Sequence, residues 1–472
     1  MTDNRHTGAG DAARPAGHSA NGSTPGAGRA GGGSRKVIAA SLVGTSLEWY
    51  DFFLYATASA VVFNKLFFPT FDPLVGTLLA FTTASVGFIA RPLGGIIFGH
   101  FGDRHGRKRV LVITLMLMGG ATFLIGALPS YASIGIAAPI MLGVLRFFQG
   151  IGLGGEWGGA VLMTLEHGDP RRRGFNASWP QVGVPVGNLL AAAVLGALSA
   201  LLSEQAFLAW GWRVGFLLSG GLMLVGLWIR RTIAESPLFT DLEHKGEQAK
   251  LPLLEVIKNH PRGLLVSMGL RIGTDVAFYT FTSYILVYLT TSLKMSRSVG
   301  LNAVLIGSAC QLALIPLFGA LSDRYGRRPI YAIGAISAAA WSIAFFPLLG
   351  TKSVLVIILT TVVALITHAA MYGPQAAFVA ELFSTKLRFS GAAGYQLAGV
   401  LSGGIAPIVS IALVAKFGTP YAVSCYVVAM LALTLVALKW APETAHQDLT
   451  EEPSDAATPD GWQPSTAASR AS

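Results

Sequence analysis

Residues 99–109 read Gly-His-Phe-Gly-Asp-Arg-His-Gly-Arg-Lys-Arg, a short basic segment between two long apolar runs. A matching segment, Gly-Ala-Leu-Ser-Asp-Arg-Tyr-Gly-Arg-Arg, occupies residues 319–328, so Asp103 and Asp323 lie 220 residues apart. A pattern G-x-x-x-D-R-x-G-R-K/R that occurs twice indicates a chain built from two related halves. Its glycines permit close helix packing, its aspartate suits a helix N-terminus or an arginine, and its cations suit an anionic membrane surface. The alternative is an ordinary basic loop.

The composition is that of an integral membrane protein. Hydrophobic residues make up 52% of the 472 residues and charged residues only 12%, against about a quarter charged in soluble domains. The net charge of +10 does not indicate nucleic-acid binding, because the cations occupy short loops rather than one face. Cys310 and Cys425 both lie in apolar segments, which supports neither a disulfide framework nor a metal site.

Apolar runs long enough to cross a bilayer, about 20 residues each, predict an all-α membrane protein with twelve spans in two pseudo-symmetric six-helix bundles. We expect a disordered cytoplasmic tail at residues 1–35, an N-terminal bundle at 36–232, a cytoplasmic linker at 233–262, a C-terminal bundle at 263–441 and a second disordered tail at 442–472. The expected spans are 37–63, 75–100, 110–128, 136–164, 176–200, 211–231, 263–291, 300–321, 329–350, 353–380, 390–415 and 420–440.

The loop cations predict the orientation. If the N-terminus is cytoplasmic, the loops on that side hold most of the cations: Arg104, Arg107, Lys108, Arg109, Arg171, Arg172, Arg173, Arg230, Arg231, Lys245, Lys250, Lys258, Arg262, Arg324, Arg327, Arg328, Lys386 and Arg388. The opposite loops hold only Lys65, Lys294, Arg297, Lys352 and Lys416. By the positive-inside rule, both termini are expected to be cytoplasmic.

Charged side chains within the spans are the functional candidates, since each costs on the order of 3 kcal/mol near the bilayer centre. Their presence on spans from both halves predicts a shared polar cavity between the bundles, where transporters bind substrates and coupling ions. Desolvation favours a protonated carboxyl group and a nearby arginine favours an ionised one, which allows such a group to be tuned for proton coupling. The proton-coupling candidates are Glu48, Asp51 and Asp275. The substrate-binding candidates are Arg91, Arg146, Gln149, Glu156, Arg271, Tyr279 and His368.

Two alternatives to these roles remain open. The charged residues can instead form structural ion pairs between helices, and a lone histidine such as His368 is more often a packed residue. Gly150-Ile-Gly152-Leu-Gly154-Gly155 matches a dinucleotide-binding pattern, but it lies inside an apolar helix without a preceding strand. We therefore assign it to close helix packing. No metal-ligand spacing or nucleophile motif is present in the sequence, so we expect no enzyme activity, no cofactor and no metal.

Twelve spans with the doubled loop motif resemble the major facilitator superfamily, and six shorter motifs resemble its metabolite:proton symporters. These are Leu47-Glu-Trp-Tyr-Asp-Phe52, Phe88-Ile-Ala-Arg-Pro-Leu-Gly-Gly95, Arg146-Phe-Phe-Gln-Gly150, Gly154-Gly-Glu-Trp-Gly-Gly159, Gly211-Trp-Arg213 and Glu235-Ser-Pro-Leu-Phe239. The match covers residues 36 to about 445, and the first half is most similar to the shikimate-permease branch. The family also includes carriers of proline and betaine, α-ketoglutarate and citrate.

The resemblance implies a transporter of the inner membrane that works by alternating access. Its partners are then a small organic substrate, the protons that drive transport, and the lipid bilayer. We expect import of an organic anion by a monomer. The repeated loop is then a gate formed by Gly99, Asp103, Arg104, Gly106, Arg107, Asp323, Arg324, Gly326 and Arg327, with Asp103 beside the start of span 11 near Ser390 and Gly391. The alternatives are a proline and glycine betaine symporter and an efflux antiporter. The tail after Trp440 lacks a coiled-coil pattern and span 5 lacks a G-P-x-x-G-G run, which disfavour the osmosensing carriers and the antiporters respectively.

Overall fold

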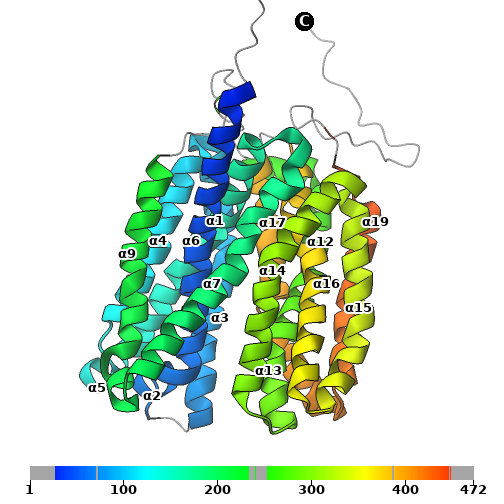
Figure 1. The fold of residues 1–472 in the computed structure, drawn as a ribbon. Coiled ribbons are helices and arrows are strands. Elements are labelled where there is room, and N and C mark those ends of the chain that lie inside the picture. Colours follow the sequence, from blue (N-terminus) through cyan, green and yellow to red (C-terminus); the bar gives the residue numbers. More distant parts are fainter. Residues whose placement is uncertain are drawn as a thin grey trace, which may run out of the picture.

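The computed structural model describes residues 27–70, 73–232, 240, 252–384, 387–445 and 447, and these form helices without any strand. The helices make two bundles that stand side by side, one from each half of the chain (Figure 1). Most of the expected tails and most of the expected linker lie outside the described residues. Within the expected linker, α11 (Pro252–Asn259) is a helix that leads into the second bundle.

The first bundle contains α1 (Ala27–Ala58), α3 (Pro73–His105), α4 (Arg107–Ala127), α6 (Ala137–His167), α7 (Arg173–Leu201) and α9 (Trp212–Arg231). Its shorter pieces are η1 (Ser59–Phe63), α2 (Asn64–Leu66), α5 (Tyr131–Ile134), η2 (Pro170–Arg172), α8 (Glu204–Ala206) and η3 (Phe207–Gly211).

The second bundle contains α12 (Pro261–Tyr279), α14 (Arg297–Tyr325), α15 (Arg327–Gly350), α16 (Val354–Glu381), α17 (Arg388–Leu401), α18 (Ala406–Phe417) and α19 (Tyr421–Trp440). After α12 the same span continues through η4 (Thr280–Tyr284), α13 (Ile285–Val287) and η5 (Tyr288–Ser292). Among the described residues, 11 helices are long and apolar enough to cross a membrane. The 33-residue helix α3 runs beside them in the first bundle.

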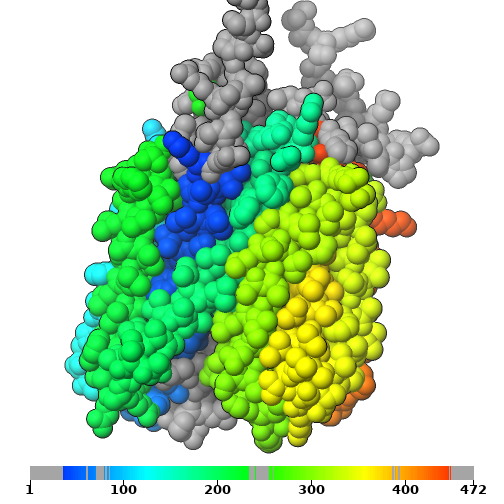
Figure 2. Space-filling model, in the orientation of Figure 1, coloured from blue at the N-terminus to red at the C-terminus, as the bar shows by residue number. Residues whose placement is uncertain are grey.

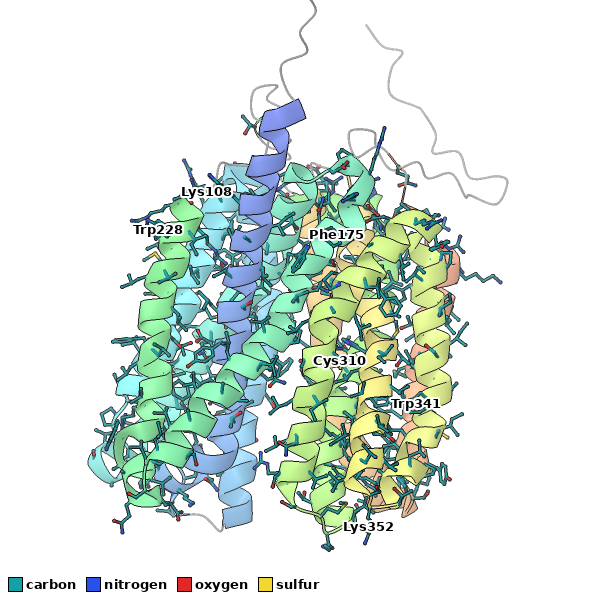
Figure 3. All side chains as sticks on the ribbon, viewed as in Figure 1. Lys108, Phe175, Trp228, Cys310, Trp341 and Lys352 are labelled. Atoms are coloured by element: carbon teal, nitrogen blue, oxygen red, sulfur yellow. The ribbon has the colours of Figure 1, made fainter. Side chains whose placement is uncertain are left out.

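The outside of the bundles is apolar and their interior holds the charges. Leu224, Trp228 and Ile333 are each more than half exposed, whereas Glu48, Asp51 and Arg91 are buried. Figure 3 shows Trp228 on the outer side of the first bundle and Trp341 on the second. An apolar exterior around a polar interior is the arrangement required by lipid, in which backbone and charged groups find partners only within the protein.

Glycines determine how closely α3 and α6 pack. A Cβ atom on Gly154 would overlap the carbonyl oxygen of Arg91, and one on Gly150 would overlap that of Gly87. The glycine-rich run that mimics a dinucleotide-binding pattern is therefore a helix contact, as expected from its apolar surroundings.

Two helix boundaries differ from the expected ones. α1 begins at Ala27, inside the stretch expected to be a disordered tail, because extending an existing helix needs no new nucleation. The expected span 390–415 is two helices, α17 and α18, which are separated by Ser402-Gly403-Gly404-Ile405. Two glycines followed by Pro407 lower helix propensity enough to allow the break, which lies beside Tyr279 because a Cβ on Gly403 would contact that ring.

The two bundles meet mainly along two helix pairs, α7 with α14 and α3 with α17, and α7 also packs against α16. Figure 2 shows the first of these pairs as a diagonal seam on the surface. We call the end of the bundles that carries both copies of the doubled motif the repeat-loop end. Lys108 marks this end in Figure 3, and Lys352 marks the opposite end.

Candidate functional site: a polar cavity between the two bundles

A cavity lies between the bundles, with a volume of about 40 Å³ open to the centre of a water molecule. Both halves contribute to its walls, mainly with aromatic and charged side chains. The lining residues are Thr45, Glu48, Trp49, Arg91, Leu153, Trp157, Val184, Arg271, Asp275, Phe278, Tyr279, His368, Tyr372, Tyr395 and Gln396. This central cavity brings together six of the ten residues that the sequence proposed for proton coupling and substrate binding.

Arg91 on α3 lines this cavity and forms no ion pair with a carboxylate among the residues that the structure describes. Its guanidinium carbon lies 4.2 Å from the ring centre of Phe88 and 4.9 Å from that of Phe52. The Nε atom is buried and has no hydrogen-bond partner within the described part of the chain. A buried guanidinium held over aromatic faces, with a donor free, is suited to bind a planar anion.

Arg271 on α12, by contrast, is already neutralised. Its Nε atom donates to Asp275 Oδ2 at 2.8 Å, and its Nη1 atom donates to the Tyr395 carbonyl at 2.8 Å and to Gln396 Oε1 at 3.0 Å. Ser402, at the break between α17 and α18, donates to the same Asp275 oxygen at 3.1 Å. The pair therefore ties α12 to α17 at the level of the cavity.

His368 on α16 also lines the cavity, where it stacks on Tyr372 with ring centres 5.0 Å apart. Its Nδ1 atom lies 2.9 Å from the side-chain amide nitrogen of Gln311. Because an amide NH₂ group donates, Nδ1 accepts and the proton of the neutral ring lies on Nε2.

Asp51 lies inside the first bundle and does not line the central cavity. Thr122 donates to Asp51 Oδ2 at 2.8 Å, and Ser219 donates to Oδ1. Gln149 donates to the Thr122 hydroxyl at 2.6 Å and accepts from Arg146 at 3.1 Å. Arg146 and Gln149 thus connect to Asp51 through hydrogen bonds, rather than facing the cavity as proposed substrate ligands would.

Glu156 is likewise turned away from the cavity. It forms an ion pair with Arg230 Nη2, which also lies 3.3 Å from Glu48 Oε1. Thr114 donates to the second oxygen of Glu156 at 3.3 Å. Arg230, expected as a loop cation, is instead buried and holds α9 against α1 and α6, because a carboxylate buried in the bundle requires a cation nearby.

An aromatic stack closes the cavity toward the repeat-loop end. Trp157 on α6 and Tyr395 on α17 lie parallel with ring centres 4.0 Å apart. Trp157 also donates to Gln181 at 2.8 Å, and Tyr395 donates to Gln375 at 3.1 Å. The two rings belong to different bundles, so the stack exists only while the bundles are close at this level.

The aspartates of the doubled motif bind backbone N–H groups of the opposite bundle. Asp103 accepts from Ser390 N at 2.9 Å, at the start of α17, which is the position that the family resemblance implied. Asp323 accepts from Gly174 N at 2.7 Å and from Phe175 N at 2.9 Å, at the start of α7. The free N–H groups of a helix N-terminus favour an anion, so each contact fastens one bundle to the other.

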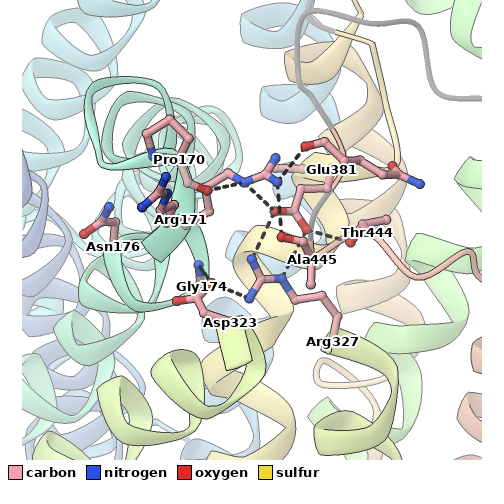
Figure 4. A network of polar contacts seen from close by, with 12 residues as sticks. Pro170, Arg171, Gly174, Asn176, Asp323, Arg327, Glu381, Thr444 and Ala445 are labelled. Carbon is pink, nitrogen blue, oxygen red and sulfur yellow. Dashed lines mark hydrogen bonds and ion pairs between the residues drawn. The ribbon is translucent and has the colours of Figure 1, made fainter. Parts of the chain in front are cut away.

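The arginines of the doubled motif belong to two related ion-pair clusters. Arg107 pairs with Glu166, which also lies 3.2 Å from Arg388 of the other bundle. Arg327 pairs with Glu381 at 3.1 Å, and Arg173 of the first bundle lies 3.4 Å from the same carboxylate. Figure 4 shows this second cluster together with Asp323, Gly174 and Thr444.

The remaining gate candidates divide into glycines that shape the loop and exposed cations. Gly106 and Gly326 adopt φ angles of 97° and 98°, a conformation that L-residues rarely adopt, and each precedes the first residue of a helix. Gly99 is buried, whereas Arg104 and Arg324 are exposed and form no cross-bundle ion pair among the described residues.

Comparison with known proteins agrees with this geometry. The model of the sugar (and other) transporter family matches residues 36–261, and that of the major facilitator superfamily matches residues 269–470. The chain is 39% identical to the inner membrane metabolite transport protein YhjE of Escherichia coli (strain K12), over 88% of this chain and 95% of that protein. It is 40% identical to the shikimate transporter of the same strain, over 84% and 92% of the two chains.

The chain belongs to the major facilitator superfamily. A further relative in this superfamily is the glycine betaine/proline/ectoine/pipecolic acid transporter OusA of Dickeya dadantii (strain 3937), at 36% identity over 88% of this chain and 84% of that protein. The solved structure of the proton:xylose symporter XylE bound to 6-bromo-6-deoxy-D-glucose superposes with a TM-score of 0.75, at 19% identity, over 89% of this chain and 98% of that chain. The protein is a multi-pass membrane transporter and not an enzyme.

Sequence reasoning missed five buried residues of this superfamily member. Arg230 was assigned to a loop, as were Arg173 and Arg388, and Glu166 and Glu381 were not considered. A signal for four of them is present, because Glu166 precedes Arg173 by seven residues and Glu381 precedes Arg388 by the same spacing. This second repeat, close to the doubled motif in each half, could have identified both ion-pair clusters.

Proposed function

We propose that the protein is a proton-coupled symporter that imports a small organic anion by alternating access. The observation that carries the substrate class is Arg91, a buried cation of the central cavity without a carboxylate partner among the described residues. Asp275 already pairs with Arg271, and Glu48 lies beside Arg230 rather than Arg91. Arg91 is therefore the cation of the cavity that, among the described residues, is available to pair with a carboxylate substrate.

Proton coupling is supported by the position of Asp51. This carboxylate is buried in the first bundle with two hydroxyl donors and, among the described residues, no ion pair. A proton is the charge that can neutralise it without rearranging the bundle. We propose Asp51 as the coupling group, with Glu48 and Asp275 facing the cavity.

The proposal also covers the orientation of the chain in the membrane, its oligomeric state and the conformation of the structure. We propose that the repeat-loop end faces the cytoplasm of a bacterial inner membrane, with both termini on that side, and that the chain acts as a monomer in the bilayer. The exposed Arg104 and Arg324 at this end support that orientation through the positive-inside rule. At this end the bundles are joined by the Trp157–Tyr395 stack, by the contacts of Asp103 and Asp323 with helix N-termini, and by the two ion-pair clusters. With this orientation, the structure is a state closed to the cytoplasm.

The test is uptake into proteoliposomes of labelled shikimate and a panel of other hydroxy and keto acids, under an imposed proton gradient or an imposed sodium gradient. We expect uptake of at least one acid to follow the proton gradient and to be inhibited by carboxylates without a cationic group. Uptake that follows sodium alone contradicts the coupling. Inhibition by glycine betaine but not by simple carboxylates would make the protein a proline and betaine carrier, and resistance to drugs without any uptake would make it an efflux antiporter.

One substitution tests the residue that carries the proposal. Arg91→Gln should lower uptake of the acid by roughly 10- to 150-fold, because a hydrogen bond to a charged group contributes about 1.5–3 kcal/mol. Arg297→Gln removes an exposed arginine outside the cavity and should leave uptake unchanged. Equal effects of the two substitutions would contradict a substrate contact at Arg91.

A further inference from the structure

Glu48 on α1 lines two separate cavities. One is the central cavity between the bundles. The other is a smaller cavity inside the first bundle, lined by Leu47, Glu48, Asp51, Leu115, Met118, Gly119, Ser219, Leu222 and Met223. Asp51 lines only the smaller cavity. Between Asp51 and the central cavity, Glu48 is thus the titratable side chain that faces both spaces.

The smaller cavity has the size and the polarity to hold a single water molecule. The volume open to the centre of a water molecule is about 10 Å³, which is close to the minimum for one water. Glu48, Asp51 and the Ser219 hydroxyl offer the polar partners that a buried water needs. Because Glu48 and Asp51 are three residues apart on one helix, their side chains lie on the same face, within reach of a shared water.

The environment of Glu48 leaves it able to exchange a proton. Glu48 and Glu156 share one cation, Arg230, so the cluster carries one surplus negative charge unless it holds a proton, and surplus charge inside a membrane protein is costly. Glu156 is the closer partner of Arg230 and also accepts from Thr114. Glu156 is therefore the ionised partner, and Glu48 is the group that gains and loses the proton.

Other charged groups face Glu48 from the helices packed around it. Across the central cavity lie Arg91 on α3, Arg271 and Asp275 on α12, and His368 on α16. On the side of the first bundle, Arg146 connects to Asp51 through Gln149 and Thr122. Among the described residues, Arg230 is the cation that forms an ion pair with Glu48, at 3.3 Å.

We propose that Glu48 is the proton relay between the central cavity and Asp51. A proton from water in the central cavity binds the Glu48 carboxylate, which then releases a proton through one water molecule to Asp51. Glu48 is ionised again after the transfer and pairs with Arg230, while Asp51 becomes neutral. The inference rests on the proposed proton symport, and it adds the route by which the coupling proton enters the first bundle.

The experiment follows protonation without any substrate. The purified full-length protein is subjected to a pH jump, and time-resolved infrared spectroscopy records the carboxyl band that Asp51→Asn removes. In Glu48→Gln the Asp51 band should rise about 100-fold more slowly, the scale of loss when a positioned proton-transfer group is removed. Glu48→Asp keeps a carboxyl group at the position on a side chain one methylene shorter, and should give a rate between those of Glu48→Gln and the parent.

Glu204→Gln is the control, because Glu204 pairs with Lys65 and lines neither cavity. It should leave the rate of the Asp51 band within about twofold of the parent, since no proton-transfer group is lost. A parent rate in Glu48→Gln, or equal slowing in Glu204→Gln, overturns the relay. If Glu48→Gln does not fold, intermediate slowing in Glu48→Asp supports the relay and a parent rate overturns it. If the parent protein shows no Asp51 band at all, Asp51 does not take up the coupling proton. That result would contradict the proposed function rather than the relay.

Discussion

Substitution of Asp323 by Asn should open the repeat-loop end of the transporter. In the structure the two carboxylate oxygens of Asp323 accept the N–H groups of Gly174 and Phe175 in the opposite bundle. An asparagine has one acceptor oxygen, so it keeps one of these bonds and turns an NH₂ group toward the other N–H. The substitution leaves helix α7 with an unsatisfied donor and removes the negative charge from its N-terminus.

The size of the effect follows from these contacts. A hydrogen bond to a charged acceptor contributes about 1.5–3 kcal/mol, and the lost interaction with the helix dipole adds about 0.3–1 kcal/mol. Because these contacts exist only while the bundles are closed at this end, their loss shifts the equilibrium between conformations. The hydrogen bond alone corresponds to an increase of roughly 10- to 150-fold in the ratio of open to closed protein.

Cysteine accessibility measures this ratio. Cys310 and Cys425, both exposed, are first replaced by serine, and a reporter cysteine replaces Ser178, which is buried on α7 against Gly319 of the other bundle. The rate of alkylation by a membrane-impermeant maleimide, applied from the repeat-loop side, should rise by the same factor in Asp323→Asn. Asp103→Asn should have a smaller effect, because an asparagine at position 103 can still accept from Ser390 N.

Asp169→Asn is the control for this measurement. Asp169 also accepts a backbone N–H at the same end, but from Arg171 of its own bundle. Alkylation in this variant should match the parent. If Asp323→Asn also matches the parent, while its thermal stability in detergent is normal, the aspartate contacts do not hold the bundles together and the gate must depend on the ion-pair clusters instead.

Two further substitutions test the packing of the first bundle. Gly154→Ala places a methyl group against the Arg91 carbonyl and should lower the stability by about 1–3 kcal/mol, which is measured as a lower melting temperature in detergent. Gly120→Ala is the control, because its methyl group meets no atom within 4 Å, and it should leave the melting temperature unchanged. Equal melting temperatures in the two variants would contradict close packing of α3 and α6. Arg230→Gln leaves Glu48 and Glu156 without their cation and should cost about 3–5 kcal/mol, part of which Glu156→Gln should restore in the double variant. No restoration in the double variant would show that Arg230 acts by some means other than charge neutralisation.

The architecture follows from local features of the amino-acid sequence. The length and hydropathy of each apolar run, together with the doubled loop motif, led to twelve spans in two bundles and to the superfamily. They could do so because the bilayer sets the length and polarity of each span locally, one segment at a time. The family resemblance placed Asp103 beside Ser390, a contact that involves backbone groups at a helix end rather than a particular side-chain orientation.

Which intramembrane charges meet depends on the tertiary packing. Arg91, Arg271 and Asp275 share the central cavity, whereas Arg146 and Glu156, both on α6, face the interior of the first bundle. Likewise, Arg230 stands at the end of a span in the sequence, yet it turns inward to bind two carboxylates. The physical reason is that hydropathy constrains the depth of a residue but not the rotation of its helix, and rotation is set by close packing between helices that are far apart in the chain.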